Sequence, residues 1–174
     1  MSDFDGAIKA YQETLRLDPG HTKAAANLSG VFRNSGDTIA ARKVVADILR
    51  RVPGDSHALL ARAELDKQSG DCESAVAAYR QVLSIQPNDD ATYSSYLFTL
   101  NFVPGVSAET VLAEHRRYGE ALARRIPQLP PQASTRRHER LRIGYVSPDF
   151  RRHSVSCFVE PLLRHHDRSK VEVF

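Results

Sequence analysis

The sequence has 174 residues, of which 41% are hydrophobic and 26% charged, an ordinary balance for a globular protein that excludes a chain disordered throughout. Residues 1–103 carry 11 Lys and Arg against 13 Asp and Glu, and residues 104–174 carry 13 against 8, so the second part favours phosphate-bearing ligands or has a solvated Arg-rich surface. Two distant cysteines, no membrane-length apolar run and no signal peptide indicate a cytoplasmic protein with no membrane partner.

A 34-residue period dominates the first part of the chain, because Pro19, Pro53 and Pro87 are 34 residues apart, as are Gly36 and Gly70. The same register aligns small residues (Ala7, Ala41 and Ala75) and large apolar ones (Leu15, Leu49 and Leu83). Gly suits the turn between two helices, Ala allows helices to approach closely, large apolar side chains fill the core, and Pro ends the second helix. The period therefore predicts a solenoid of helix pairs.

The repeat boundaries follow from this register. Residues 1–21 form a partial repeat, residues 22–55 and 56–89 form two complete repeats, and residues 90–103 form one further helix. Repeat arrays need neighbours or caps to cover their faces, so more repeats are expected upstream. In the second complete repeat, Arg62 and Asp66 stand where apolar residues are usual. The sequence therefore does not determine the shape of the groove at this repeat.

Residues 104–139 are predicted to form a capping helix followed by a linker. Pro104 and Gly105 break the preceding helix, and Ser107 suits the N-cap of a helix that runs to about Arg125. Residues 126–139 contain three prolines and then a polar, basic stretch, which is the composition of a linker.

The segment from residue 140 to residue 174 changes period and composition. The predicted elements are a strand at residues 141–146, a helix at residues 155–166 and a strand that begins at residues 171–174. Ser147, Pro148 and Asp149 supply turn chemistry, and Ser154 or Ser156 is the expected N-cap of the helix. The predicted fold is therefore mainly α, a solenoid followed by the first βαβ segment of an α/β lobe.

The repeat pattern resembles the tetratricopeptide repeat, with Gly36 at the turn, Ala41 at the small position and Pro53 near the end. Joined to it, the stretches YSSYLFTLNFVPGVSAETVLAEHRRYGEALARR and GYVSPDFRRHSV resemble the bacterial relatives of the O-linked N-acetylglucosamine transferases, the group that includes the plant SPINDLY proteins. The resemblance implies a solenoid that presents acceptor proteins to two Rossmann-like lobes in the GT-B arrangement, which residues 140–174 would begin. It also implies UDP-N-acetylglucosamine as donor, Ser or Thr hydroxyls as acceptors, and no metal.

His153 is the candidate catalytic residue. It follows the predicted strand and precedes a helix start, where ligands of open α/β sheets gather and where unpaired N–H groups suit a phosphate. A histidine there can donate to a phosphate, exchange a proton near neutral pH, or only cap the helix. The resemblance places His153 at the active-site histidine of the family's DFxxH stretch, and leaves open whether it deprotonates the acceptor or positions the diphosphate.

Asn27 is the candidate substrate-binding residue. By the same resemblance, related solenoids line their groove with asparagines that hold a peptide backbone, since a carboxamide both donates and accepts. Asn27 matches that position, whereas Ala61 and Ser95 occupy its equivalents in the next units. A surface or turn-capping asparagine is the alternative. Cys157 stands where the family often has a second histidine, and it is expected to be a small buried residue, although a lone Cys near a helix start could instead have a lowered pKa.

Neither a metal site nor nucleic-acid binding is predicted. His165 and His166 are adjacent on a helix and point in different directions, and no third ligand has suitable spacing. Favourable charge at a helix C-terminus explains them. The paired arginines lack the interleaved aromatic residues of a single-strand binder.

Two classes of function follow. The first is a fragment of a protein O-glycosyltransferase, expected to be inactive by itself because half of a βαβ unit exposes unpaired strand edges and an α/β domain needs on the order of 100 residues or more. The residues that would choose between UDP-N-acetylglucosamine and GDP-fucose are expected mostly in the second lobe, which is absent. The second is a repeat adaptor that binds a peptide in its groove without catalysis.

Overall fold

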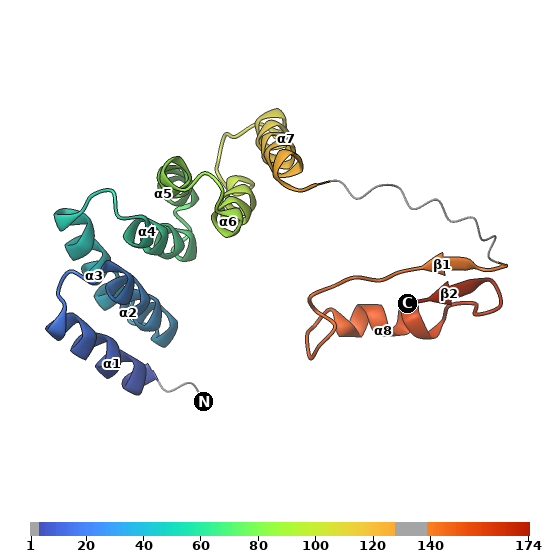
Figure 1. The fold of residues 1–174 in the computed structure, drawn as a ribbon, viewed down its shortest axis with the longest axis horizontal. Helices are drawn as coiled ribbons and strands as arrows, with labels where there is room; N and C mark the ends of the chain where they lie inside the picture. Colours follow the sequence, from blue (N-terminus) through green and yellow to red (C-terminus); the bar gives the residue numbers. More distant parts are fainter. Residues whose placement is uncertain (1–3, 128–138) are drawn as a thin grey trace. The chain divides into compact units, whose positions relative to one another are not determined.

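The computed structural model describes residues 4–127 and 139–174. The chain divides into two compact units, Met1–Pro127 and Gln128–Phe174, and each is described by itself (Figure 1). We call residues 4–127 the repeat segment and residues 139–174 the sheet segment. The predicted fold class is confirmed: helices in pairs make up the repeat segment, and the sheet segment contains a short parallel sheet.

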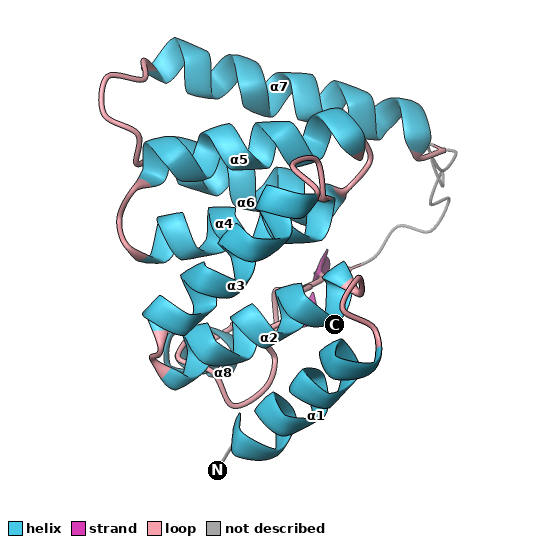
Figure 2. Ribbon diagram, turned by 90° about the vertical axis from the view of Figure 1, so that its left-hand side faces the viewer, coloured by secondary structure: helices cyan, strands magenta, loops and turns pink. Residues whose placement is uncertain are grey.

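Consecutive helices of the repeat segment pack against one another along the chain (Figure 2). They are α1 (Phe4–Leu17), α2 (Thr22–Ser35), α3 (Thr38–Arg51), α4 (Ser56–Gln68), α5 (Cys72–Ile85), α6 (Asp90–Leu100) and α7 (Ala108–Arg125). Besides these sequential contacts, α2 packs on α4, so the first helices of the two complete repeats lie side by side. That pairing creates a surface built from corresponding positions of neighbouring repeats.

The turns between paired helices have the chemistry that the period predicts. Gly36 ends α2 in the left-handed region, with a φ of 92°, and Gly70 has a φ of 85° between α4 and α5. Asp37 and Asp71 then cap α3 and α5, each accepting a hydrogen bond from a backbone N–H of the first turn. Gly tolerates the positive φ and Asp satisfies the unpaired helix donors, so the Gly-Asp turn is confirmed.

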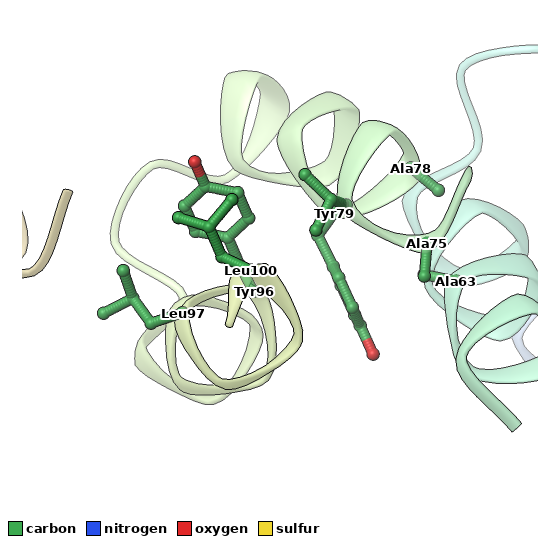
Figure 3. Close-up of a cluster of buried hydrophobic side chains, with 8 residues drawn as sticks. Ala63, Ala75, Ala78, Tyr79, Tyr96, Leu97 and Leu100 are labelled. Carbon is green, nitrogen blue, oxygen red and sulfur yellow. The ribbon is translucent and has the colours of Figure 1, made fainter. Parts of the chain in front are cut away.

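The core of the repeat segment combines small and large side chains. Ala41 and Ala75, which share one register of the period, are fully buried and let neighbouring helices approach. Tyr79 is also fully buried, and Figure 3 shows its ring between the helix of Tyr96 and the helix of Ala63. Such burial of aromatic and aliphatic surface is the main source of stability in this segment.

Of the two polar residues at apolar positions of the second repeat, Asp66 has a partner in the repeat before it. Asp66 is only 6% exposed, and the guanidinium of Arg42 donates to its Oδ1 over 2.8 Å. Arg42 also donates to Ser69 Oγ over 3.0 Å, so α3 and α4 are joined by an ion pair as well as by apolar packing. The Nε of Arg62 lies 3.9 Å from Asp66 Oδ2 and has no hydrogen bond among the described residues.

The last helix of the repeat segment, α7, begins where the sequence predicts. Ser107 Oγ accepts the backbone N–H of Thr110 over 3.2 Å, which confirms the predicted N-cap. The ring of Tyr118 stacks on Tyr93 of α6 with centroids 4.7 Å apart. Residues 128–138 of the predicted linker lie outside the described residues. Of the helices in 4–127 and 139–174, none combines the length and apolar character that a membrane span requires.

The sheet segment has the predicted order of strand, helix and strand. Its elements are β1 (Leu141–Ile143), α8 (Ser156–Arg164) and β2 (Val171–Val173). The strands are parallel, with Leu141 opposite Val171 and Ile143 opposite Val173. The strand is shorter than the predicted residues 141–146: β1 ends at Ile143, opposite Val173 where β2 ends, and a further backbone hydrogen bond runs from the N–H of Tyr145 to the carbonyl oxygen of Phe174 over 3.2 Å.

The predicted cap of α8 is wrong. Val155 occupies the N-cap position without a side-chain hydrogen bond. The hydroxyl of Ser156 instead donates to the carbonyl oxygen of His153 over 2.7 Å, which fastens the preceding loop to the first turn. The helix also ends earlier than the predicted residue 166, at Arg164, where the N–H of His165 donates to the carbonyl of Pro161.

Candidate functional site

The first candidate site is a pocket between α2 and α4, which we call the groove pocket. Its volume is about 160 Å³, and its lining residues are Ala26, Asn27, Ser29, Gly30, Arg33, His57, Leu60, Ala61, Glu64 and Leu65. Asn27 is exposed at its wall, and Ala61, the equivalent residue one period later, lies on the same pocket. The structure therefore brings these two predicted groove positions together, while Ser95 does not line this pocket.

A charged cluster forms one side of the groove pocket, centred on Glu64 of α4. The hydroxyl of Tyr79 donates to Glu64 Oε1 over 2.5 Å, and the ammonium of Lys67 lies 2.7 Å from Oε2. Arg33 of α2 contacts the same oxygen at 3.5 Å. Burial works against ionisation of Glu64, but hydrogen bonds from Lys67 and Tyr79 and the charge of Arg33 outweigh it and lower the pKa of this carboxyl.

Sequence reasoning missed this cluster, although a signal was present. Arg33 and Lys67 are one 34-residue period apart, so equivalent positions on two adjacent repeats carry a positive charge. The acidic partner, Glu64, stands where the preceding repeat has Gly30. Reading the period for charge as well as for apolar residues would have placed these three residues on one surface.

The second candidate site is the loop between β1 and α8. His153 is exposed in this loop, at the carboxyl side of β1 and just before α8, as predicted. Its Nδ1 accepts the backbone N–H of Val155 over 3.2 Å, and its Nε2 lies 3.9 Å from Asp149 Oδ1, beyond hydrogen-bond distance. Because Nδ1 is an acceptor, the neutral imidazole carries its proton on Nε2 and can donate it outward.

The contact to Val155 means that His153 also orders the start of the helix, as the alternative interpretation supposed. The two roles are compatible, because Nδ1 accepts the backbone N–H and Nε2 makes no hydrogen bond to Asp149 at 3.9 Å. His153 does not line the cavity of about 300 Å³ beside α8, which is formed by Asp149, Phe150, Arg151, Val155, Ser156, Val159, Glu160 and Leu163. The catalytic role of His153 stays a prediction.

Cys157 is exposed, so its expected burial is wrong. It lies in the first turn of α8, on a helix that has no buried residue, and an apolar interior is therefore not available to it. Its thiol is free.

The two adjacent histidines have separate partners. His165 Nδ1 is hydrogen-bonded to the carbonyl oxygen of Pro161 at 2.8 Å, and His166 Nε2 is joined to the hydroxyl of Tyr145 at 2.7 Å. Within residues 4–127 and 139–174, no group of three or more His, Cys, Asp or Glu side chains is arranged to hold a metal ion.

Two family models match the chain. Residues 1–65 match the tetratricopeptide repeat, and residues 121–174 match glycosyl transferase family 41. The groove pocket lies within the first matched range, and the loop of His153 lies within the second.

Curated relatives include proteins named probable UDP-N-acetylglucosamine–peptide N-acetylglucosaminyltransferase SPINDLY. The protein from Oryza sativa is 35% identical over 99 residues, which cover 56% of this chain and 11% of that protein. The protein from Arabidopsis thaliana is 34% identical over 90 residues, which cover 51% of this chain and 10% of that protein. The chain thus spans about a tenth of the length of these relatives.

Two solved structures show the same fold. A mutant of the O-GlcNAc transferase of Thermobaculum terrenum matches with a TM-score of 0.71 and 21% identity, over 99% of this chain and 37% of that one. The protein MamA matches with a TM-score of 0.53 and 16% identity, over 70% of this chain and 68% of that one. The chain therefore has a tetratricopeptide-repeat fold, matches the model of glycosyl transferase family 41 over residues 121–174, and is similar in sequence to the SPINDLY proteins.

Proposed function

We propose that this chain supplies the acceptor-binding repeats and the first loop of the donor site of a protein O-glycosyltransferase. The observation that carries the proposal is the succession, in one chain, of a repeat groove and a strand-loop-helix element with His153 at the helix start. The reaction is transfer of N-acetylglucosamine from UDP-N-acetylglucosamine to a Ser or Thr hydroxyl. Metal-independent transfer in the cytoplasm is part of the proposal.

In this reaction the acceptor hydroxyl oxygen forms a bond to the anomeric carbon of the sugar. The bond from that carbon to the diphosphate breaks, UDP leaves, and the hydroxyl proton passes to a base. The Nδ1 of His153 is engaged by the N–H of Val155, which leaves Nε2–H as a donor. This arrangement favours contact with the diphosphate, where a hydrogen bond stabilises the charge that develops on the leaving group, over the role of base.

The test is a pair of substitutions in the native gene product that contains this chain. His153→Ala is expected to lower turnover by about 100-fold, because it removes a positioned donor at the reacting group. His153→Gln places an amide N–H₂ near the position of Nε2 and is expected to recover much of the loss. Transfer of labelled sugar to an acceptor protein measures both, and unchanged turnover in His153→Ala would remove His153 from the mechanism.

The same assay identifies which nucleotide sugar is the donor. UDP-N-acetylglucosamine and GDP-fucose are offered in parallel, with and without a chelator, since the family resemblance allows either sugar and requires no metal. Transfer from GDP-fucose alone would replace the donor but keep the reaction class. Loss of transfer with the chelator would contradict the metal-independent mechanism.

A second function, a peptide-binding adaptor, is favoured by one observation. The groove pocket is formed entirely by α2 and α4, so it needs nothing from the sheet segment. If the native gene product is an adaptor, it would bind peptide but transfer neither N-acetylglucosamine nor fucose. If it is a transferase, it would bind peptide and transfer one of these sugars to it.

A further inference from the structure

We propose that the groove pocket selects acceptor segments that have an apolar side chain and, two residues away from it, an acidic one. The inference rests on the proposed function, in which the groove receives an extended acceptor. It concerns the sequence that the groove prefers, which depends on four residues of the pocket lining: Gly30, Arg33, Ala61 and Glu64.

The pocket is small and largely apolar. Ala26, Leu60 and Ala61 contribute methyl and isobutyl groups to its lining. Its volume of about 160 Å³ is close to the roughly 150 Å³ of an apolar cavity that accepts benzene. A leucine, isoleucine or phenylalanine side chain therefore fits, and burying it releases water from apolar surface on both partners.

Two small residues create this space. Ala61 stands one period after Asn27, so the second repeat offers a methyl group where the first offers a carboxamide. Gly30 lies within α2, and a Cβ built on it meets no other atom within 4 Å. The volume is therefore open above Gly30, and the second repeat can hold a ligand side chain but cannot make the carboxamide contacts of the first.

The charge around the pocket determines the second preference. Arg33 and Lys67 surround the single carboxylate of Glu64, which leaves an excess of one positive charge among these three residues. Lys67 is the closer partner at 2.7 Å, and the contact from Arg33 is 3.5 Å long. A guanidinium has five N–H donors, so Arg33 can also bind a carboxylate of the ligand beside the pocket.

The spacing of the two preferences comes from the ligand. In an extended segment successive side chains point to opposite faces, so residues two apart share a face. An apolar side chain in the pocket therefore brings the side chain two positions away to the same wall, which carries Arg33. Glutamate or aspartate at that position is complementary to the excess positive charge.

The test uses peptides and the 174-residue chain. The probe is an acetylated and amidated peptide of Ser, Thr and Gly that contains one leucine, with one glutamate two residues before it and another two residues after it. Two further peptides replace the leucine by glutamine or both glutamates by lysine. Amide chemical shifts of the ¹⁵N-labelled protein report where each peptide binds, and titration gives its Kd.

The leucine and glutamate peptide is expected to shift the amides of Gly30, Arg33 and Ala61. The glutamine peptide is expected to bind at least about tenfold more weakly, the scale of burying one leucine side chain. The lysine peptide is expected to bind several-fold more weakly, with a difference that shrinks as salt is added. Equal affinities for the three peptides, or shifts confined to other helices, would overturn the proposal.

Variants of the protein provide the matched control. Gly30→Leu fills the pocket and is expected to weaken binding of the leucine peptide at least about tenfold, whereas Gly30→Ala is expected to leave it within about twofold. Gly119→Leu in α7 makes the same change where a Cβ also meets nothing within 4 Å, far along the chain from the pocket. Both leucines suit a helix better than glycine, so circular dichroism should show folded proteins. Unchanged binding in Gly30→Leu would contradict the proposal.

Failure here differs from failure of the proposed function. The peptides are titrated without any nucleotide sugar, so a selective pocket in a protein that transfers no sugar refutes the transferase and keeps the pocket. Transfer that depends on His153 but shows no preference among the three peptides keeps the transferase and refutes the pocket.

Discussion

The repeat segment and the sheet segment obtain their structure in different ways. The repeat segment has a core of buried side chains, including Tyr79, Tyr96 and Leu100. In the described part of the sheet segment no residue is buried, and the elements are joined by backbone hydrogen bonds between β1 and β2 and around the loop of His153. Side-chain burial stabilises the first segment, whereas the second shows mainly local order.

The difference indicates where mutations act. Substitutions in the core of the repeats should change the free energy of unfolding of the chain. Substitutions in the sheet segment should change this free energy little, and under the proposed function they should act on the turnover of transfer. The first of the four predictions below compares the two segments, and the other three sharpen the account of the repeat segment.

The largest effect is expected for Tyr79→Ala. The side chain is fully buried, so its removal leaves a cavity and should lower the free energy of unfolding by about 3–5 kcal/mol. Leu162→Ala in α8 is the control, because Leu162 is 50% exposed and its truncation should cost less than about 1 kcal/mol. Urea unfolding followed by circular dichroism measures both, and similar losses would abolish the distinction between the segments.

Asp66→Ala is expected to cause the second largest loss of stability. It leaves the guanidinium groups of Arg42 and Arg62 without their carboxylate between α3 and α4, at an expected cost of about 1–3 kcal/mol. Asp47→Ala is the matched control, because its pair with Arg50 lies on one helix and both side chains are exposed. An equal cost at the two positions would mean that the inter-repeat ion pair adds nothing to stability.

The turn glycine predicts a pair of opposite effects. Gly36→Ala places a Cβ on a residue with a φ of 92° and should destabilise by about 1–2 kcal/mol. Gly30→Ala, inside α2, should stabilise by about 0.5–1 kcal/mol because alanine is the better helix former. Thermal unfolding should place the two midpoints on opposite sides of the wild type. Shifts of the same sign would contradict the assignment of Gly36 as a conformational requirement.

The smallest effect is a dependence on pH in the groove. The pKa of Glu64 is lowered in the folded chain, so its stabilisation is complete above the pKa of the unfolded state and is lost as the pH falls through the folded value. Glu64→Gln should therefore be less stable than wild type at neutral pH, by less than about 1 kcal/mol. The difference in stability between wild type and Glu64→Gln should disappear in acid, and urea midpoints between pH 3 and pH 7 would measure it. A difference that increases in acid would contradict a lowered pKa of Glu64.

Much of the repeat segment was predictable because its contacts repeat with the sequence. The 34-residue period identified the turn at Gly36 and the buried Ala41, and local capping chemistry identified the helix that starts after Ser107. Each of these depends on neighbours in the chain or on the adjacent repeat. Local capping chemistry and a fixed register are sufficient for such features.

Features that depend on one particular tertiary contact were not predictable. Asp66 is satisfied by Arg42, a residue 24 positions away on another helix, and no local pattern pairs them. The expected serine cap of α8 failed because the helix begins at Ser156 itself, which places Val155 at the N-cap position, and the hydroxyl of Ser156 donates to the carbonyl oxygen of His153. Burial of Cys157 was expected from residue type alone, and residue type does not specify which face of a helix is covered.

The openness of α2 at Gly30 has a consequence for how such a protein changes over generations. Gly30 lines the groove pocket, and a Cβ built on it meets no other atom within 4 Å, while the neighbouring Ala25 and Leu28 are buried. A new side chain at position 30 therefore changes the pocket while the packing of α2 stays intact. Under the proposed function, a lineage carrying this array can therefore change the acceptor segments that it prefers by single codon changes at position 30, with the scaffold inherited unchanged.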